Sequence, residues 1–186
     1  MGDKIKVIMD CDPGIDDGIA LAYAAAHQDE LELLAVTTSA GSNRIERVTK
    51  NALELVDFYG LKVPVAGGQD RPLVRTAFHA EEFHGETGLG HCVLPEAKSE
   101  AVSDNAVLFI RDILNDLPED EQVIMIETAP MTNLALLLKV FPEIKDKIRK
   151  IVFTGGAAKG GNITPAAEFN IYADPEAAKI VFDSGI

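Results

Sequence analysis

The sequence is poor in basic residues. Its 186 residues include 17 Lys and Arg against 30 Asp and Glu, which gives a net charge of −13. Proteins that bind the nucleic-acid backbone neutralise phosphates with Lys and Arg, so this charge argues against a DNA or RNA polymer as partner. A divalent cation, or a small neutral or cationic ligand, fits the charge better.

Cysteines and long apolar runs are also scarce. Cys11 and Cys92 are too few for the disulfide framework of a small secreted protein. The longest apolar stretches, such as LALLLKVF, are far shorter than the roughly 20 residues that cross a bilayer. No signal-peptide pattern opens the sequence. We therefore expect a globular protein in the cytoplasm, with no membrane partner.

Short β-branched runs alternate with segments of helical period. The predicted strands are 4–9, 31–38, 63–68, 121–128 and 150–156. The predicted helices are 16–27, 44–59, 103–117, 131–141, 142–147 and 174–183, and a long loop covers 69–99. This alternation predicts right-handed βαβ units, and hence one α/β domain over residues 1–186 with a mainly parallel sheet flanked by helices. Ligands of such sheets bind beyond the carboxyl ends of the strands.

Four aspartates crowd the end of the first predicted strand, in the stretch DCDPGIDD. Two carboxylates about 5 Å apart repel each other by roughly 3 kcal/mol at an effective dielectric constant near 20. Capping the following helix needs only one aspartate, Asp16, and leaves the other three unexplained. Ca²⁺ binds six to eight oxygen ligands, so a calcium site at the edge of the sheet accounts for the whole cluster.

Two other sites built on aspartates can be compared with the same stretch. An EF-hand loop starting at Asp10 needs Gly at its sixth position and Glu at its twelfth, where this chain has Ile15 and Leu21. A phosphohydrolase with an aspartyl nucleophile also places D-x-D after a strand, and it needs a basic residue for the phosphate. Lys159 is the one basic residue in a suitable later loop, so this alternative remains open.

The stretch DCDPGIDD resembles the signature of the nucleoside hydrolases, the inosine-uridine-preferring family of N-ribohydrolases. Four later blocks resemble family blocks in the same order: TTSAG, HGETGLG, TAPMTNLA and GNITPAAEFNIYADPEAA. The resemblance implies hydrolysis of the N-glycosidic bond of a ribonucleoside to ribose and free base. It also implies bound Ca²⁺ as cofactor and a homodimer or homotetramer for the full-length protein.

The resemblance also implies roles for single residues. Asp12 would be the general base and a metal ligand. Asp17 and the backbone carbonyl of Thr128 would be further metal ligands, and Asp10 a structural carboxylate behind them. An oxocarbenium-like transition state develops positive charge on the ribose, which such oxygens stabilise more strongly than they stabilise the neutral substrate.

The implied substrate contacts lie in three parts of the chain. Asp16 and Asn170 would hydrogen-bond the 2′ side of the ribose. Asn162 and Glu168 would hold the 5′-hydroxyl. Phe169 would lie against the sugar, and His84 near the base.

The chain departs from the family pattern in three places. Many members have Gly-Asn after the second strand, where this chain has Gly41 followed by Ser42 and Asn43, so either Asn43 or Ser42 takes the place near the metal. Thr154 stands where a Met often contacts the ribose. Ile186 is expected to begin a further strand, and a His-Asp pair of the family has no counterpart before it. We therefore expect an N-terminal portion of a longer hydrolase with impaired activity, the alternative being an inactive nucleoside- or ribose-binding module.

Overall fold

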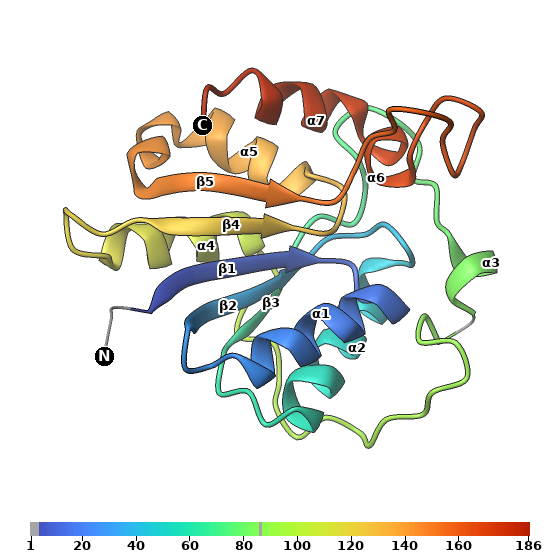
Figure 1. Ribbon diagram of the computed structural model, residues 1–186, viewed down its shortest axis with the longest axis horizontal. Helices are drawn as coiled ribbons and strands as arrows, with labels where there is room; N and C mark the ends of the chain where they lie inside the picture. Colours follow the sequence, from blue (N-terminus) through green and yellow to red (C-terminus); the bar gives the residue numbers. More distant parts are fainter. Residues whose placement is uncertain (1–3, 86) are drawn as a thin grey trace.

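The computed structural model describes residues 4–85 and 87–186, which contain a five-stranded sheet (Figure 1). Its neighbouring strands are all parallel, in the order β3-β2-β1-β4-β5. The strands are β1 (Ile5–Cys11), β2 (Leu31–Thr38), β3 (Val65–Gly67), β4 (Val123–Glu127) and β5 (Ile148–Phe153). The helices are α1 (Ile15–Ala26), α2 (Ile45–Phe58), α3 (Glu81–His84), α4 (Ala106–Asp116), α5 (Thr132–Val140), the 3₁₀ helix η1 (Pro142–Lys147), α6 (Phe169–Ala173) and α7 (Pro175–Phe182). The predicted α/β fold class is confirmed.

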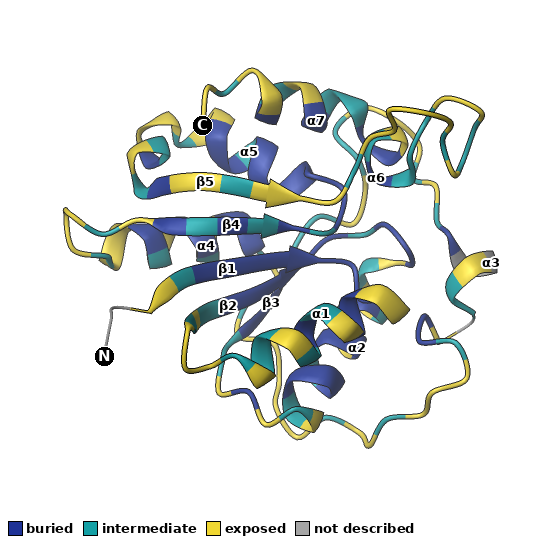
Figure 2. Ribbon diagram, in the orientation of Figure 1, coloured by how far each residue is buried: buried dark blue, intermediate teal, exposed yellow. Residues whose placement is uncertain are grey.

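Helices cover both faces of the sheet, because consecutive side chains of β1 point to opposite faces. Met9 packs in an apolar cluster with residues of α1 and α2, whereas Ile8 packs in a second cluster with residues of α4, α5 and α7. Figure 2 shows β1 and the adjoining part of β2 as largely buried between these layers. Burial of each such aliphatic side chain contributes about 1.5–3 kcal/mol to the free energy of unfolding. The two clusters hold the carboxyl ends of the strands at one edge of the sheet.

The prediction for β1 was too short by two residues. β1 ends at Cys11, so Asp10 lies inside the sheet, opposite Thr37 of β2 and Glu127 of β4. One acidic residue, Asp10, in the buried part of β1 defeats a prediction that ends strands at charged residues. At the other end of the chain, Gly185 has the left-handed φ of +81° expected after a helix. Ile186 itself lies outside any strand, and the strand expected to begin there stays a prediction.

Two short helices interrupt stretches that the sequence predicts as loops. α3 lies within 69–99, and α6 directly precedes α7. Asp174 caps α7, because its carboxylate accepts a hydrogen bond from the Ala177 N–H, and Pro175 occupies the first turn. None of the helices in the described ranges is long and apolar enough to cross a membrane.

Candidate functional site

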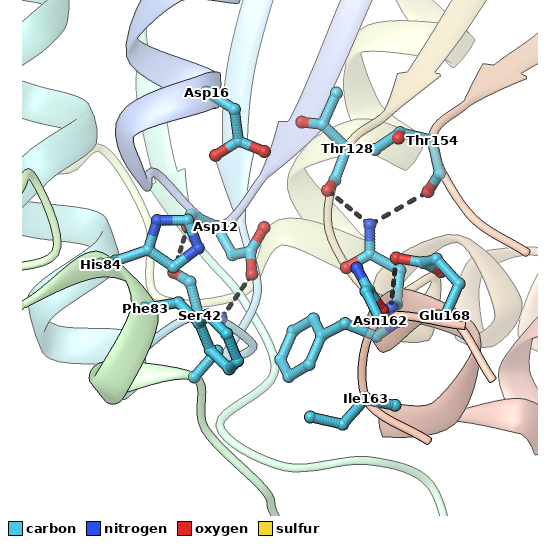
Figure 3. Close-up of a pocket in the computed structure, with 13 residues that line it drawn as sticks. Asp12, Asp16, Ser42, Phe83, His84, Thr128, Thr154, Asn162, Ile163 and Glu168 are labelled. Atoms are coloured by element: carbon cyan, nitrogen blue, oxygen red, sulfur yellow. Dashed lines mark hydrogen bonds between the residues drawn. The ribbon is translucent and has the colours of Figure 1, made fainter. Parts of the chain in front are cut away.

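A cavity of about 370 Å³ opens beyond the carboxyl ends of the strands. Its volume lies in the range of small-molecule sites, roughly 300–1,000 Å³. In Figure 3, Asp12, Ser42 and His84 stand on one side of it, and Asn162 and Glu168 on the other. The remaining lining residues are Asp16, Ala80, Phe83, Thr128, Thr154, Ile163, Phe169 and Asn170. Segments from 12 to 170 thus meet here, as the parallel topology predicts.

Asp12 is held at the base of the cavity by the turn that follows β2. The Ser42 N–H donates to Asp12 Oδ2 at 2.5 Å, and the Ser42 hydroxyl donates to the Asp12 backbone carbonyl at 2.5 Å. Burial raises the pKa of Asp12 well above its usual value, the neighbouring charge of Asp17 raises it further, and the Ser42 N–H opposes both. Burial and the Asp17 charge therefore favour proton binding at Asp12, and the Ser42 N–H fixes the orientation of its carboxylate.

Asp17 lies beside Asp12 at the start of α1. Its Oδ2 accepts a hydrogen bond from the Asp12 backbone N–H at 3.2 Å. Burial raises the pKa of Asp17 to about 6, opposed first by a hydrogen bond from the Thr128 side chain. Asp16, the next residue back, is exposed and lines the cavity. Gly14 occupies the N-cap of α1 without a side-chain cap, so helix capping by Asp16 does not explain the cluster.

The residues predicted as metal ligands lie in contact with one another. Asp17 touches both the Asp12 backbone and the Thr128 side chain. Within residues 4–85 and 87–186, no three or more His, Cys, Asp or Glu side chains are grouped to hold a metal ion. Two buried carboxylates and one backbone carbonyl can still supply part of the oxygen shell of Ca²⁺. The donor set therefore fits a hard cation whose other ligands come from water, substrate or further protein groups.

Asp10 belongs to a separate acidic pair beneath the cavity. Asp10 Oδ1 accepts hydrogen bonds from the Thr37 hydroxyl at 2.6 Å and the Asn133 amide at 2.9 Å. The fully buried Glu127 faces Asp10 across the strand pair, and among the described residues neither Asp10 Oδ2 nor the Glu127 carboxyl oxygens have a hydrogen-bond partner. Burial, and then the Asp10 charge, raise the pKa of Glu127 well above its usual value. Burial raises the pKa of Asp10 itself to about 6. Burial therefore favours proton binding by this pair of carboxyl groups.

The far wall of the cavity is built around α6. Glu168 caps this helix, because its carboxylate accepts hydrogen bonds from the N–H groups of Asn170, Ile171 and Gly156. The Asn162 amide oxygen accepts from the Phe169 N–H at 2.8 Å, which leaves its NH₂ group for the cavity. These bonds fix the orientation of polar groups that a ribose hydroxyl would meet.

Asn170 joins the ends of β4 and β5. Its NH₂ group donates to the carbonyls of Thr128 at 2.9 Å and Thr154 at 3.0 Å, so its amide oxygen is the group left to contact a ligand. The predicted contact with the ribose therefore reduces to one acceptor atom. The same two bonds orient the Thr128 carbonyl that the sequence predicts as a metal ligand.

His84, predicted to lie near the base, lines the cavity, whereas Asn43, predicted as one of two candidates near the metal, does not. His84 lines the cavity, and its Nδ1 accepts a hydrogen bond from the Ile15 N–H at 3.4 Å. Asn43 is buried and turns away, because its side-chain oxygen accepts from the Arg44 N–H. Of the two residues proposed for the position near the metal, Ser42 is thus the one at the cavity.

Sequence reasoning missed three polar residues that organise the site. Asn133 and Glu127 surround Asp10, and Asn51 donates to the carbonyls of Pro13 and Thr87, which ties the turn after Asp12 to the loop that carries His84. A signal was present for Glu127 only, since a carboxylate at the end of an apolar strand matches the pattern used for Asp10. Both asparagines lie on helices, where their partners depend on tertiary packing.

Comparison with known proteins gives a consistent assignment. The profile of the family described as "Inosine-uridine preferring nucleoside hydrolase" matches residues 7–186. The chain belongs to this family. It is 50% identical over 181 residues to the pyrimidine-specific ribonucleoside hydrolase RihA of Photobacterium profundum, covering 97% of this chain and 57% of that protein. It is 45% identical to the non-specific ribonucleoside hydrolase RihC of Escherichia fergusonii, covering 98% of this chain and 59% of that protein.

Solved nucleoside hydrolases share the fold. The purine-preferring ribonucleoside hydrolase from Gardnerella vaginalis superposes with a TM-score of 0.89 at 37% identity, over 97% of this chain and 58% of that chain. A plant nucleoside hydrolase superposes with a TM-score of 0.88 at 35% identity, over 98% of this chain and 58% of that chain. The chain thus spans less than two thirds of the length of these relatives.

Proposed function

We propose that this chain carries a Ca²⁺-dependent site for hydrolysis of the N-glycosidic bond of ribonucleosides to ribose and free base. The supporting observation is a pair of buried carboxylates, Asp12, which lines the cavity, and Asp17, which lies beside it and accepts a hydrogen bond from its N–H. No Lys, Arg or His forms an ion pair with either of them in the part of the chain that the structure describes. A bound cation would offset the desolvation and mutual repulsion that raise both pKa values.

The cation would be held by Asp12, Asp17 and the Thr128 carbonyl. When bound, it supplies the positive charge that lowers the pKa of a water and orients ribose hydroxyls. Asp12 then accepts the proton of the attacking water, in the orientation that the Ser42 N–H imposes on its carboxylate. The fixed oxygens around the cavity stabilise the positive charge that develops on the ribose.

The ribose would lie between the α6 wall and the Asp12 side. Asn162 offers its NH₂ group, Asn170 its amide oxygen, and Asp16 an exposed carboxylate. The ring of Phe169 supplies an apolar surface between them, and His84 faces the region left for the base. The names of the relatives differ in the preferred base, so the proposed substrate class is ribonucleosides without a base preference.

The phosphohydrolase alternative receives no support from the cavity. Its lining residues include no Lys or Arg, and Lys159 is exposed and is not among them. A phosphate would therefore meet Asp12, Asp16 and Glu168 without a cationic side chain from the residues that line the cavity.

Calorimetric titration with Ca²⁺, alongside an assay for base released from inosine and uridine, tests the proposal. Wild-type protein is expected to bind Ca²⁺, and Asp17→Asn to bind it at least about tenfold more weakly because a charged ligand is lost. Asp183→Asn, which removes an equal charge from an exposed residue of the α7 end, is the matched control. Nucleoside binding without base release would favour the inactive binding module, and absence of Ca²⁺ binding by the wild type would contradict the proposal.

A further inference from the structure

The turn that holds Asp12 is itself held from the opposite side by the loop that leads into α3. His79 Nδ1 lies 3.2 Å from the Gly41 carbonyl oxygen, and the Ala80 N–H donates to the Ser42 carbonyl at 3.1 Å. A carbonyl oxygen can only accept, so Nδ1 of His79 carries the proton in this contact. Two adjacent loop residues therefore bind two adjacent carbonyls of the Gly41–Ser42 turn.

One peptide plane links His79 to Asp12. The Gly41 carbonyl and the Ser42 N–H belong to the same peptide unit, and they point in opposite directions because the unit is planar and trans. The Nδ1–H of His79 donates to the Gly41 carbonyl oxygen, and the Ser42 N–H donates to Asp12 Oδ2. Hydrogen bonds in such a chain polarise one another, so the donor at one end strengthens the bond at the other.

The turn leaves no space for a side chain at residue 41. A Cβ atom at Gly41 would lie 2.3 Å from Asp12 Oδ2 and 2.7 Å from the Pro130 ring, which is closer than real contacts allow. Glycine therefore lets the backbone approach the carboxylate directly. With no side chain at residue 41, the orientation of the plane depends on hydrogen bonds: those at its two ends, and those that the flanking Gly41 N–H and Ser42 carbonyl make in the same turn.

We propose that His79 is a positioning residue, whose Nδ1–H orients the Gly41–Ser42 peptide and through it the carboxylate of Asp12. The consequence for catalysis and for Ca²⁺ rests on the proposed function, whereas the hydrogen-bond chain does not. Ala80, Phe83 and His84 of the same loop line the cavity. The contact of His79 therefore also couples the loop that carries His84 to the carboxylate of Asp12 on the same side of the cavity.

Three variants separate this role from a general effect on the loop. His79→Leu removes the donor and keeps the bulk of the side chain, and His79→Asn keeps an N–H donor at a similar distance from the backbone. His91→Leu is the matched control, because His91 is an exposed histidine of the same loop outside the cavity lining. Thermal unfolding of each variant identifies any loss of the fold.

The first measurement is hydrogen exchange at the Ser42 amide in protein without metal. His79→Leu is expected to exchange this amide about fivefold faster, the factor that one hydrogen bond of average strength corresponds to. His79→Asn should stay within about twofold of wild type, and His91→Leu should match wild type. Unchanged exchange in His79→Leu, or equal acceleration in His79→Asn, would overturn the proposal.

The second measurement is Ca²⁺ affinity, with kcat and KM for a nucleoside where turnover is detected. His79→Leu is expected to weaken Ca²⁺ binding about three- to tenfold and to lower kcat more than it raises KM, with rescue by His79→Asn. If wild-type protein binds no Ca²⁺, the proposed function fails, and the Ser42 exchange still decides the role of His79.

Discussion

Asp12 follows strand β1, and Asp174 precedes helix α7. Both aspartates are buried, but the groups that contact their carboxylates differ. The carboxylate of Asp174 accepts three hydrogen bonds, from the Leu73 N–H, the Thr132 hydroxyl and the Ala177 N–H. That of Asp12 accepts one strong bond from Ser42 and faces a second buried carboxylate. Asp174 is satisfied by protein donors, whereas Asp12 and Asp17 have no ion-pair partner among the described residues.

This difference separates a structural carboxylate from a functional one. Asp174 ties the start of the 69–99 loop to α5 and α7, so its interactions contribute to the free energy of unfolding. Asp12 and Asp17 reduce that free energy in the absence of a cation, because each is desolvated and each repels the other. A folded protein keeps such a cluster where the repulsion is offset on binding.

The largest effect is expected at Asp12. Asp12→Asn should lower the rate of base release by about 10²–10⁴-fold, the range for loss of a general base, while thermal stability stays equal or rises because a buried charge is removed. The assay is release of base from inosine or uridine with saturating Ca²⁺, with circular dichroism to follow unfolding. A rate within threefold of wild type would show that another group accepts the proton.

A substitution at Asp174 should lower the stability of the fold and leave the Ca²⁺ affinity unchanged, the opposite of the result expected for Asp12. Asp174→Ala leaves three donors without their acceptor and should lower the free energy of unfolding by about 3 kcal/mol. Urea denaturation measures the loss, and Ca²⁺ affinity of the folded variant should remain near that of wild type. Glu176→Ala, at the next residue but one, removes an exposed ion pair with Arg75 and serves as control with little expected change. Equal losses in both variants would remove the distinction drawn for Asp174.

The pH dependence of stability without metal is the next prediction. The pKa of Asp17 rises from 3.8 in the unfolded chain to about 6 in the fold, so between these values the folded state binds the extra proton. Its contribution to stability is therefore full below pH 3.8 and is lost as pH rises to about 6, by roughly 3 kcal/mol at 1.36 kcal/mol per unit.

Asp17→Asn should remove that contribution. Relative to wild type in a chelator, the variant is expected to gain stability as pH rises from 4 to about 6 and to hold the gain above it. Denaturation curves at several pH values give the difference, and saturating Ca²⁺ should reverse it for wild type alone. A difference that is flat with pH would contradict the raised pKa of Asp17.

The smallest effect is expected at Glu127. Burial and the Asp10 charge raise the pKa of Glu127 and so favour its neutral form, and Glu127→Gln keeps an uncharged group of similar size that can donate to Asp10. The free energy of unfolding should change by less than about 1 kcal/mol. Glu127→Ala, which leaves a cavity and an unpaired Asp10 oxygen, should cost about 2–3 kcal/mol by comparison. A large loss in the Gln variant would mean that Glu127 is ionised in the fold.

Most of the fold was predictable, because its signals are local. The alternation of β-branched runs and helical periods located β2, α2 and α5 within one or two residues of their observed bounds. α6 escaped prediction because its five residues are capped by Glu168, whose carboxylate also binds the Gly156 N–H from another loop. β1 was cut short because Asp10 is stabilised in the sheet by Thr37 and Asn133, which are distant in the chain.

The sequence by itself determined the fold class, the order of the blocks that carry Asp12, Thr128 and Glu168, and the excess of acidic groups at one edge of the sheet. Only the tertiary structure decided which carboxylate faces the cavity, which is buried beside a second acidic residue in the sheet, and which has its acceptors satisfied by protein donors. It also decided that a histidine at residue 79 reaches Asp12 through a single peptide plane. The reason is physical: desolvation and hydrogen bonding set the behaviour of a carboxylate, and both depend on neighbours from remote parts of the chain.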